Sequence, residues 1–183
     1  MPRWRRFRPD MDARAKALRS AEIALRSAVC ENQFELHYQP LIALPEGRLT
    51  GFEALIRWRK PEGGLVPPND FLPLAEKLGL MGRMGEWVIR EACRAAASWP
   101  ESLSVSINIA PAQFKDGRLL ASLRAALAES GLAPNRLELE VTETVLLPAS
   151  GGAGGARMWK RVTSTFTVAA WAAAGSSNPN SGP

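Results

Sequence analysis

Hydrophobic and polar residues alternate with a period of two along four segments of this chain, as in strands that bury one face. The four segments are residues 34–39, 52–58, 104–109 and 137–142. Because successive side chains of a strand point to opposite sides, each segment predicts a strand with one apolar and one polar face.

Between these predicted strands, apolar residues recur at helical spacing. The predicted helices cover residues 69–78, 84–99 and 120–127. Gly79 and Gly131 would end the first and the third, because glycine readily adopts the left-handed conformation that follows many helices. Strands that alternate with helices of this length predict an α/β fold with a mostly parallel sheet.

The polar faces of the predicted strands limit the α/β architectures that fit the sequence. An open doubly wound sheet is covered by helices on both sides, so its strands are nearly continuous apolar runs. A TIM-type (β/α) barrel packs apolar side chains against its outer helices and gathers catalytic groups at the ends of its strands. The alternation fits a barrel, and it fits equally a helix-covered sheet with one solvated face.

Both ends of the chain depart from this central pattern. Residues 11–29 carry apolar positions at a loose seven-residue spacing, which predicts a connecting or coiled helix. From Pro148 to Pro183 the chain is rich in Gly, Ala and Ser and has no acidic residue. We expect a disordered or irregular tail there.

The formal net charge of +5 comes from the two ends. Residues 1–30 carry eight basic and three acidic residues, and residues 148–183 carry three basic residues and no acid. The central residues 31–147 carry 12 basic and 15 acidic residues, so this segment is mildly acidic. The charge pattern therefore argues against a nucleic-acid polymer as the partner.

Several other classes of protein are excluded by what the sequence lacks. It has no run of 18 apolar residues, which predicts no membrane span, and its basic start is not followed by the apolar stretch of a secretory signal. Cys30 and Cys93 are too few for a disulfide framework, which indicates a reduced, cytoplasmic protein. His37 is the single histidine, which argues against a histidine-based triad or a His-rich zinc site.

The polar residues of the predicted strands suggest a chemistry. They are Gln39, Glu53, Arg57, Asn108, Glu140 and Glu143. Carboxylates and an amide carbonyl are hard oxygen ligands that suit Mg²⁺ or Mn²⁺, and an arginine beside such a metal suits a phosphate oxygen. The set predicts metal-assisted hydrolysis of a phosphoester. Taken singly, the same residues also fit surface ion pairs or hydrogen-bonding positions at strand ends.

Six blocks of the chain resemble, in order and spacing, the first half of an EAL domain. They are FELHYQP (34–40), GFEALIRW (51–58), FLPLAE (71–76), GEWV (85–88), SINI (106–109) and LELEVTET (137–144). EAL domains are bacterial phosphodiesterases that open cyclic diguanylate to a linear dinucleotide on a modified TIM barrel. Residues 3–11 also resemble the end of a GGDEF (diguanylate cyclase) domain. The resemblance implies a GGDEF remnant and connecting helix over residues 1–32, a truncated EAL domain over 33–147 and an unrelated tail over 148–183.

The resemblance also implies a role for individual residues. The metal ligands of the family, which uses Mg²⁺ or Mn²⁺, correspond to Glu53, Asn108 and Glu140. The residues that bind cyclic diguanylate correspond to Gln39, Leu55 and Arg57. Glu143 resembles the glutamate that supports a loop near the metal and the dimer contact of the family.

The resemblance ends near Leu147, about halfway through a domain of roughly 240 residues. The sequence has no Asp-Asp-Phe-Gly-Thr-Gly motif, whose paired aspartates bind the metals in the family. Half a barrel would leave an unpaired strand edge after residue 144, and we expect marginal stability and self-association. A shifted reading frame is one hypothesis for the origin of the acid-free tail.

Three functional hypotheses stay open. The chain is part of an EAL phosphodiesterase that obtains its missing half from elsewhere, or a degenerate EAL module that binds nucleotide or a protein partner without catalysis. In the third hypothesis it is a truncated product that is inactive alone and melts with poor cooperativity. The incomplete set of metal ligands favours the third for this chain.

Overall fold

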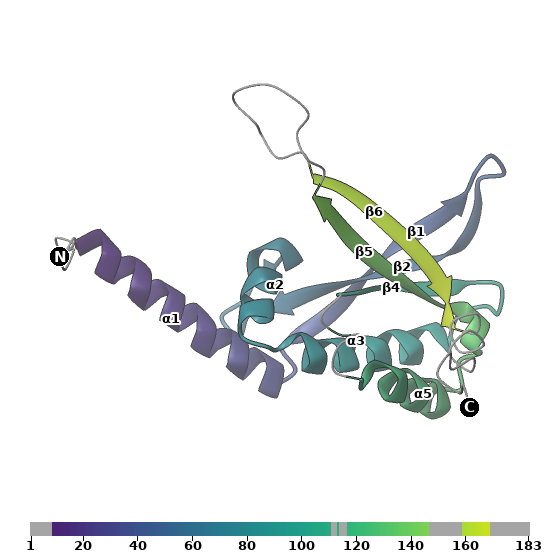
Figure 1. Ribbon diagram of the computed structural model, residues 1–183. Helices are drawn as coiled ribbons and strands as arrows, with labels where there is room; N and C mark the ends of the chain where they lie inside the picture. The colour runs from purple at the N-terminus through teal and green to yellow at the C-terminus, as the bar shows by residue number, and fades with distance from the viewer. Residues whose placement is uncertain (1–8, 111–112, 114–116, 147–158, 169–183) are drawn as a thin grey trace, which may run out of the picture. The chain divides into compact units, whose positions relative to one another are not determined.

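The computed structural model describes most of the central chain (Figure 1). The described residues are 9–110, 113, 117–146 and 159–168. Side chains are described for residues 12–110, 113, 117–141 and 168. The elements are α1 (Pro9–Cys30), β1 (Phe34–Ala43), β2 (Arg48–Arg59), β3 (Leu65–Val66), α2 (Pro68–Lys77), α3 (Met81–Ala96), β4 (Ser104–Ile109), α5 (Leu119–Ser130), the 3₁₀ turn η1 (Pro134–Arg136), β5 (Leu137–Leu146) and β6 (Trp159–Thr167).

The described strands form a six-stranded sheet in the order β1-β2-β4-β5-β6, with β3 paired to β2. β2 runs parallel to β4, and β4 runs parallel to β5. The connection from β2 to β4 contains α3 and the connection from β4 to β5 contains α5, as parallel neighbours require. The four strands predicted from the alternation are β1, β2, β4 and β5, and the predicted α/β class is confirmed.

The apolar faces of β4 and β5 form the main core together with α3 and α5. These two helices lie side by side along the sheet (Figure 1). Val105, Ile107 and Leu137 of the strands are completely buried, as is Leu123 of α5, and Ile89 of α3 is 1% exposed. Burial of each such side chain contributes about 1.5–3 kcal/mol, which favours the alternation of apolar and polar residues in these strands.

The two glycines predicted to end helices do so in the structure, whereas α3 lies three residues earlier than the predicted helix at both ends. Gly79 and Gly131 follow α2 and α5 with φ of +68° and +71°. α2 begins at Pro68, one residue earlier than predicted, and no side chain caps its start. The fixed φ of proline suits the first helical position, where its missing N–H costs no hydrogen bond.

Arg136 holds the C-terminal end of α3. Its Nε donates to the Leu103 carbonyl at 2.9 Å, and Nη2 donates to the carbonyls of Ala96, Trp99 and Pro100 at 2.8, 3.3 and 3.1 Å. The last carbonyls of a helix have no partner within the helix, and a cation there interacts favourably with the helix dipole. One side chain from η1 therefore connects the start of β5 to the end of α3.

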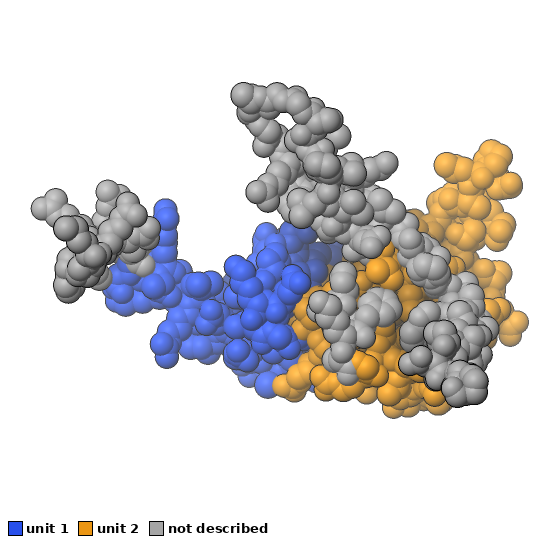
Figure 2. Space-filling view, viewed as in Figure 1, with its two compact units in different colours: residues 1–35, 57–80 blue, residues 36–56, 81–183 orange. Residues whose placement is uncertain are grey.

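The chain divides into two compact units (Figure 2). One comprises residues 1–35 and 57–80, and the other comprises residues 36–56 and 81–183. The sheet contacts of β4 and β5 and the core formed with α3 and α5 belong to the second unit.

The first unit has a small core of its own around α1 and α2. α1 covers the helix predicted over residues 11–29, and its Leu25 and Ala28 are completely buried. The ring of Phe71 lies 5.9 Å from the ring of Phe34 and 6.0 Å from that of Trp58. In the part of the chain that the structure describes, no helix is long and apolar enough to cross a membrane.

β6 lies in the segment for which the composition predicts a disordered or irregular tail. It pairs antiparallel with β5 from Glu138↔Thr167 to Leu146↔Trp159. The predicted unpaired edge of β5 is therefore wrong. The segment of β6 is rich in β-branched and aromatic residues, which favour strands even where apolar and polar positions do not alternate. Val168, directly after β6, is 4% exposed and belongs to the core of the second unit.

Candidate functional site

The polar residues of β2, β4 and β5 share one face of the sheet. The register of β2 and β4 places Glu53 opposite Ser106, and the register of β4 and β5 places Asn108 opposite Glu140. Alternate residues of a strand lie on the same face, so these four side chains share the face that is not packed on α3 and α5. We call these four residues the polar cluster.

Two short hydrogen bonds connect the polar cluster across the strands. Asn108 Nδ2 donates to Glu53 Oε1 at 2.6 Å, and Ser106 Oγ donates to Glu140 Oε1 at 2.6 Å. Ser106 is completely buried, Glu53 and Glu140 are half-buried, and Asn108 is exposed. The structure thus places the three predicted metal ligands on three adjacent strands.

Ser106 is the member of the polar cluster that the sequence does not single out. A serine between Val105 and Ile107 indicates only that this position lies on the polar face of the strand. Ser106 lies two residues before Asn108 on the same face, but Ser104 lies on that face as well, so position alone does not single out Ser106.

The polar cluster fits a hard divalent cation by the type of its donors. The side chains of Glu53, Asn108 and Glu140 offer carboxylate and amide oxygens, the ligand types that Mg²⁺ and Mn²⁺ prefer. Among the described side chains, no group of three or more His, Cys, Asp and Glu residues comes together, so the amide of Asn108 is needed as a third donor. Three protein donors leave the rest of an octahedral shell to water or to other ligands.

The predicted substrate-binding residues lie on β1 and β2. Gln39 is exposed on β1, and Leu55 is half-buried on β2, on the same face as Glu53. Arg57 lies further along β2, in the part of the strand that belongs to the first unit. Glu143 lies on β5 beyond the described side chains, so its predicted role is not tested.

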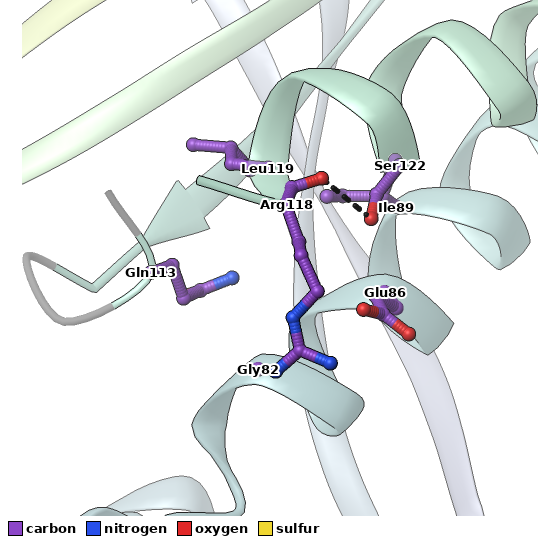
Figure 3. Close-up of a pocket in the computed structure, with 7 residues that line it drawn as sticks. All are labelled: Gly82, Glu86, Ile89, Gln113, Arg118, Leu119 and Ser122. Carbon is purple, nitrogen blue, oxygen red and sulfur yellow. Dashed lines mark hydrogen bonds between the residues drawn. The ribbon is translucent and has the colours of Figure 1, made fainter. Parts of the chain in front are cut away.

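A small cavity lies apart from the polar cluster, beside α3 and α5 (Figure 3). It is lined by Gly82, Glu86, Ile89, Gln113, Arg118, Leu119 and Ser122. Its volume of about 10 Å³ is close to the room that one water molecule needs. It shares no residue with the polar cluster and is too small to hold a nucleotide.

The buried thiol of Cys93 has no part in the candidate chemistry. Burial in the core raises the pKa of Cys93 to about 12. The thiolate is the nucleophilic form of cysteine, so Cys93 is inert at neutral pH. Tyr38 is affected similarly, because burial and the nearby Glu91 carboxylate raise its pKa to about 12 against the opposing charge of Arg94.

Comparison with known proteins gives a consistent result. Residues 16–162 match the family model described as EAL domain. The chain is 41% identical over 145 residues to the bifunctional diguanylate cyclase/cyclic di-GMP phosphodiesterase MucR of Pseudomonas aeruginosa, covering 77% of this chain and 21% of MucR. It is 42% identical over 130 residues to the cyclic di-GMP phosphodiesterase NbdA of the same organism, covering 69% of this chain and 17% of NbdA.

Solved structures agree with this match. The MucR phosphodiesterase in complex with c-di-GMP is similar with a TM-score of 0.61 and 41% identity, covering 64% of this chain and 49% of that structure. The FimX EAL domain of Xanthomonas citri in complex with c-diGMP is similar with a TM-score of 0.64 and 27% identity, covering 72% of this chain and 52% of that structure. The chain therefore spans about half of these solved domains.

The comparisons also bear on the limits of the matched region. The family match begins at residue 16, within α1, and ends at residue 162, within β6. It continues past Leu147, where the resemblance seen in the sequence ends. The chain spans about a fifth of the length of the two curated relatives named above.

Proposed function

Because this chain belongs to the EAL domain family, we propose that it is the N-terminal part of a phosphodiesterase module that hydrolyses cyclic diguanylate to the linear dinucleotide. The observation that carries the proposal is the polar cluster, which brings Glu53, Asn108 and Glu140 together on adjacent strands of the second unit. MucR and NbdA, the curated relatives, are both named as phosphodiesterases of this nucleotide.

In this proposal, Glu53, Asn108 and Glu140 hold a Mg²⁺ or Mn²⁺ ion. EAL phosphodiesterases are metal-dependent, and a bound cation would lower the pKa of a coordinated water and neutralise charge on the phosphoryl oxygens. The hydrogen bond from Asn108 fixes the Glu53 carboxylate before any ligand arrives, which lowers the entropic cost of binding.

The remaining assignments follow the family resemblance. Arg57 would bind a substrate phosphate, since guanidinium groups suit phosphate oxygens. Gln39 and Leu55 would contact the nucleotide, and Glu143 would support the loop near the metal and a dimer contact. We also propose a cytoplasmic location, for which the two free cysteines are the argument. We propose self-association because the chain spans about half of an EAL domain.

We propose further that the 183-residue chain alone binds but does not turn over its substrate. The paired aspartates of the family have no counterpart in this sequence. Two-metal sites need ligands for both ions in order to stabilise the attacking and leaving oxygens of the reaction. With two carboxylates and one amide, the polar cluster would hold a single ion weakly.

The test is titration of the purified chain with Mn²⁺ and with cyclic diguanylate, together with an assay for the linear product. We expect weak, saturable Mn²⁺ binding that Glu53→Gln weakens on the order of 10-fold or more. Glu138→Gln is the matched control, because Glu138 is a half-buried glutamate on the same sheet face that has no assigned ligand role. Equal losses in the two variants, or no Mn²⁺ binding at all, would contradict the proposal.

A degenerate module that binds nucleotide without catalysis is the second candidate. The observation that favours it is the absence of the aspartate pair from this sequence, while the similar MucR and FimX structures both hold the nucleotide. Turnover by the purified chain would contradict both candidates. Saturable binding of cyclic diguanylate in the absence of any metal would favour the degenerate module over the metal-dependent phosphodiesterase.

A further inference from the structure

The hydroxyl of Ser106 has an unusual hydrogen-bond acceptor for a buried strand residue, a side-chain carboxylate. A buried hydroxyl needs a partner, and backbone carbonyls are the usual ones. Ser106 is completely buried, and its Oγ instead donates to the side-chain oxygen Oε1 of Glu140 at 2.6 Å. A hydrogen bond to a carboxylate is shorter and roughly twice as strong as one between neutral groups.

The register of the strands shows what this bond does to Glu140. The partner of Glu140 on β4 is Asn108, and Ser106 lies two residues earlier on the same face. The bond therefore draws the Glu140 carboxylate across to β4. Asn108 holds the Glu53 carboxylate to β4 from the other side, by its own bond of 2.6 Å. Both carboxylates of the polar cluster are thus held to one strand, each by a separate donor.

Ser104 shows the contrasting case on the same strand and face. Ser104 is half-buried, and its Oγ donates to the backbone carbonyl of Thr50 at 3.4 Å instead of to a carboxylate. Ser104 therefore gives a baseline for the loss of a hydroxyl of β4 that bonds to the backbone and not to a carboxylate.

We propose that Ser106 is a positioning residue, which holds Glu140 toward β4 so that the second carboxylate oxygen is available to a cation shared with Glu53 and Asn108. The identity of that cation rests on the proposed function, whereas the orientation of Glu140 does not. Groups that orient the ligands of a metal commonly change its affinity about 10–100-fold when removed.

The experiment compares Ser106→Ala, Ser106→Cys and Ser104→Ala in the full chain. The dissociation constant for Mn²⁺ is measured from the electron paramagnetic resonance signal of the free ion. The Glu140 carboxylate is followed by ¹³C NMR without metal, with its resonance assigned from Glu140→Gln, and thermal melts monitor folding. We expect Ser106→Ala to weaken Mn²⁺ binding about 10-fold and to shift the Glu140 resonance, while Ser104→Ala changes neither.

Ser106→Cys keeps a side chain of similar size with a weaker donor, so we expect an intermediate effect. It carries the test if Ser106→Ala does not fold, and wild-type values for Ser106→Cys would then overturn the proposal. An unshifted Glu140 resonance in a folded Ser106→Ala variant, or equal effects of Ser104→Ala, would also overturn it. Absence of Mn²⁺ binding to the wild-type chain, with the Glu140 shift intact, would reject the proposed function and leave the positioning role standing.

Discussion

Ile107 and Asn108 are neighbours in β4, yet they lie in different environments. Ile107 is completely buried in the core formed with α3 and α5, whereas Asn108 is exposed and bonds to Glu53. Alternation of side chains along the strand separates the two roles by a single residue. Substitutions on the apolar face should therefore lower stability and leave the donors of the polar cluster in place. Substitutions of exposed residues on the polar face should weaken cation binding with little loss of stability.

The largest effect on stability is expected for Ile107→Ala. Removal of a completely buried isoleucine side chain creates a cavity, and such changes cost about 2–5 kcal/mol. Urea unfolding followed by circular dichroism measures the loss. Under conditions where the variant stays folded, its Mn²⁺ affinity should equal that of the wild-type chain.

Asn108→Ala is the matched control, one residue along the same strand. An exposed position predicts a change in unfolding free energy within about 0.5 kcal/mol, while Mn²⁺ binding should fall because a ligand is lost. If the two variants lose similar stability, the two faces of β4 are not energetically separate.

The next effect concerns the helix layer that covers the apolar face. Arg136→Ala removes the donor for four carbonyls at the end of α3 and beside it, and we expect a loss of about 2 kcal/mol. Arg136→Lys keeps the charge without the planar fork, so its loss should be intermediate. Chemical denaturation measures the unfolding free energy of each variant. Equal stability of Arg136→Ala and the wild-type chain would show that water replaces the guanidinium as the donor to these carbonyls.

The two faces of β4 were predictable from the sequence because its apolar residues pack on elements that are themselves predicted from apolar spacing. Val105 and Ile107 pack on helices whose own apolar spacing is regular, so local pattern and tertiary structure agree. Alternation placed Glu53, Asn108 and Glu140 on the polar faces of their strands, and the resemblance to the EAL family selected these three. The register that brings them together on adjacent strands is a finding of the structure.

Ser106 and β6 were not predictable, for different physical reasons. Nothing local distinguishes Ser106 from Ser104, because the difference between them is the acceptor that each meets across the sheet. β6 has no regular alternation, and its pairing depends on the edge offered by β5. Whether a segment without alternation forms a strand depends more on the strand that it pairs with than on its own sequence pattern.

A smaller effect tests the packing of the residue that follows β6. Val168 follows β6 and is 4% exposed, so Val168→Ala removes buried apolar surface and should cost about 1.5 kcal/mol. Ile42→Ala is the control, since Ile42 is 48% exposed on β1 and should lose less despite its larger side chain. Urea unfolding of both variants compares them, and a greater loss for Ile42→Ala would contradict the burial of Val168.

The last prediction concerns the ionisation of Cys93, which leaves stability unchanged at neutral pH and lowers it only in alkaline solution. Burial raises the pKa of the folded thiol from 9.0 to about 12, so the unfolded chain loses this proton first. The associated stability is present below pH 9 and is lost as the pH rises from about 9 to 12. Tyr38, raised from 10.0 to about 12, adds to the loss in the upper part of this range. Urea midpoints measured from pH 7 to 11 should fall above pH 9, and more steeply for the wild-type chain than for Cys93→Ala. Parallel curves for the two chains would show that the thiol ionises equally in the folded and unfolded states, and that the apolar face is more accessible to water than the burial of Cys93 indicates.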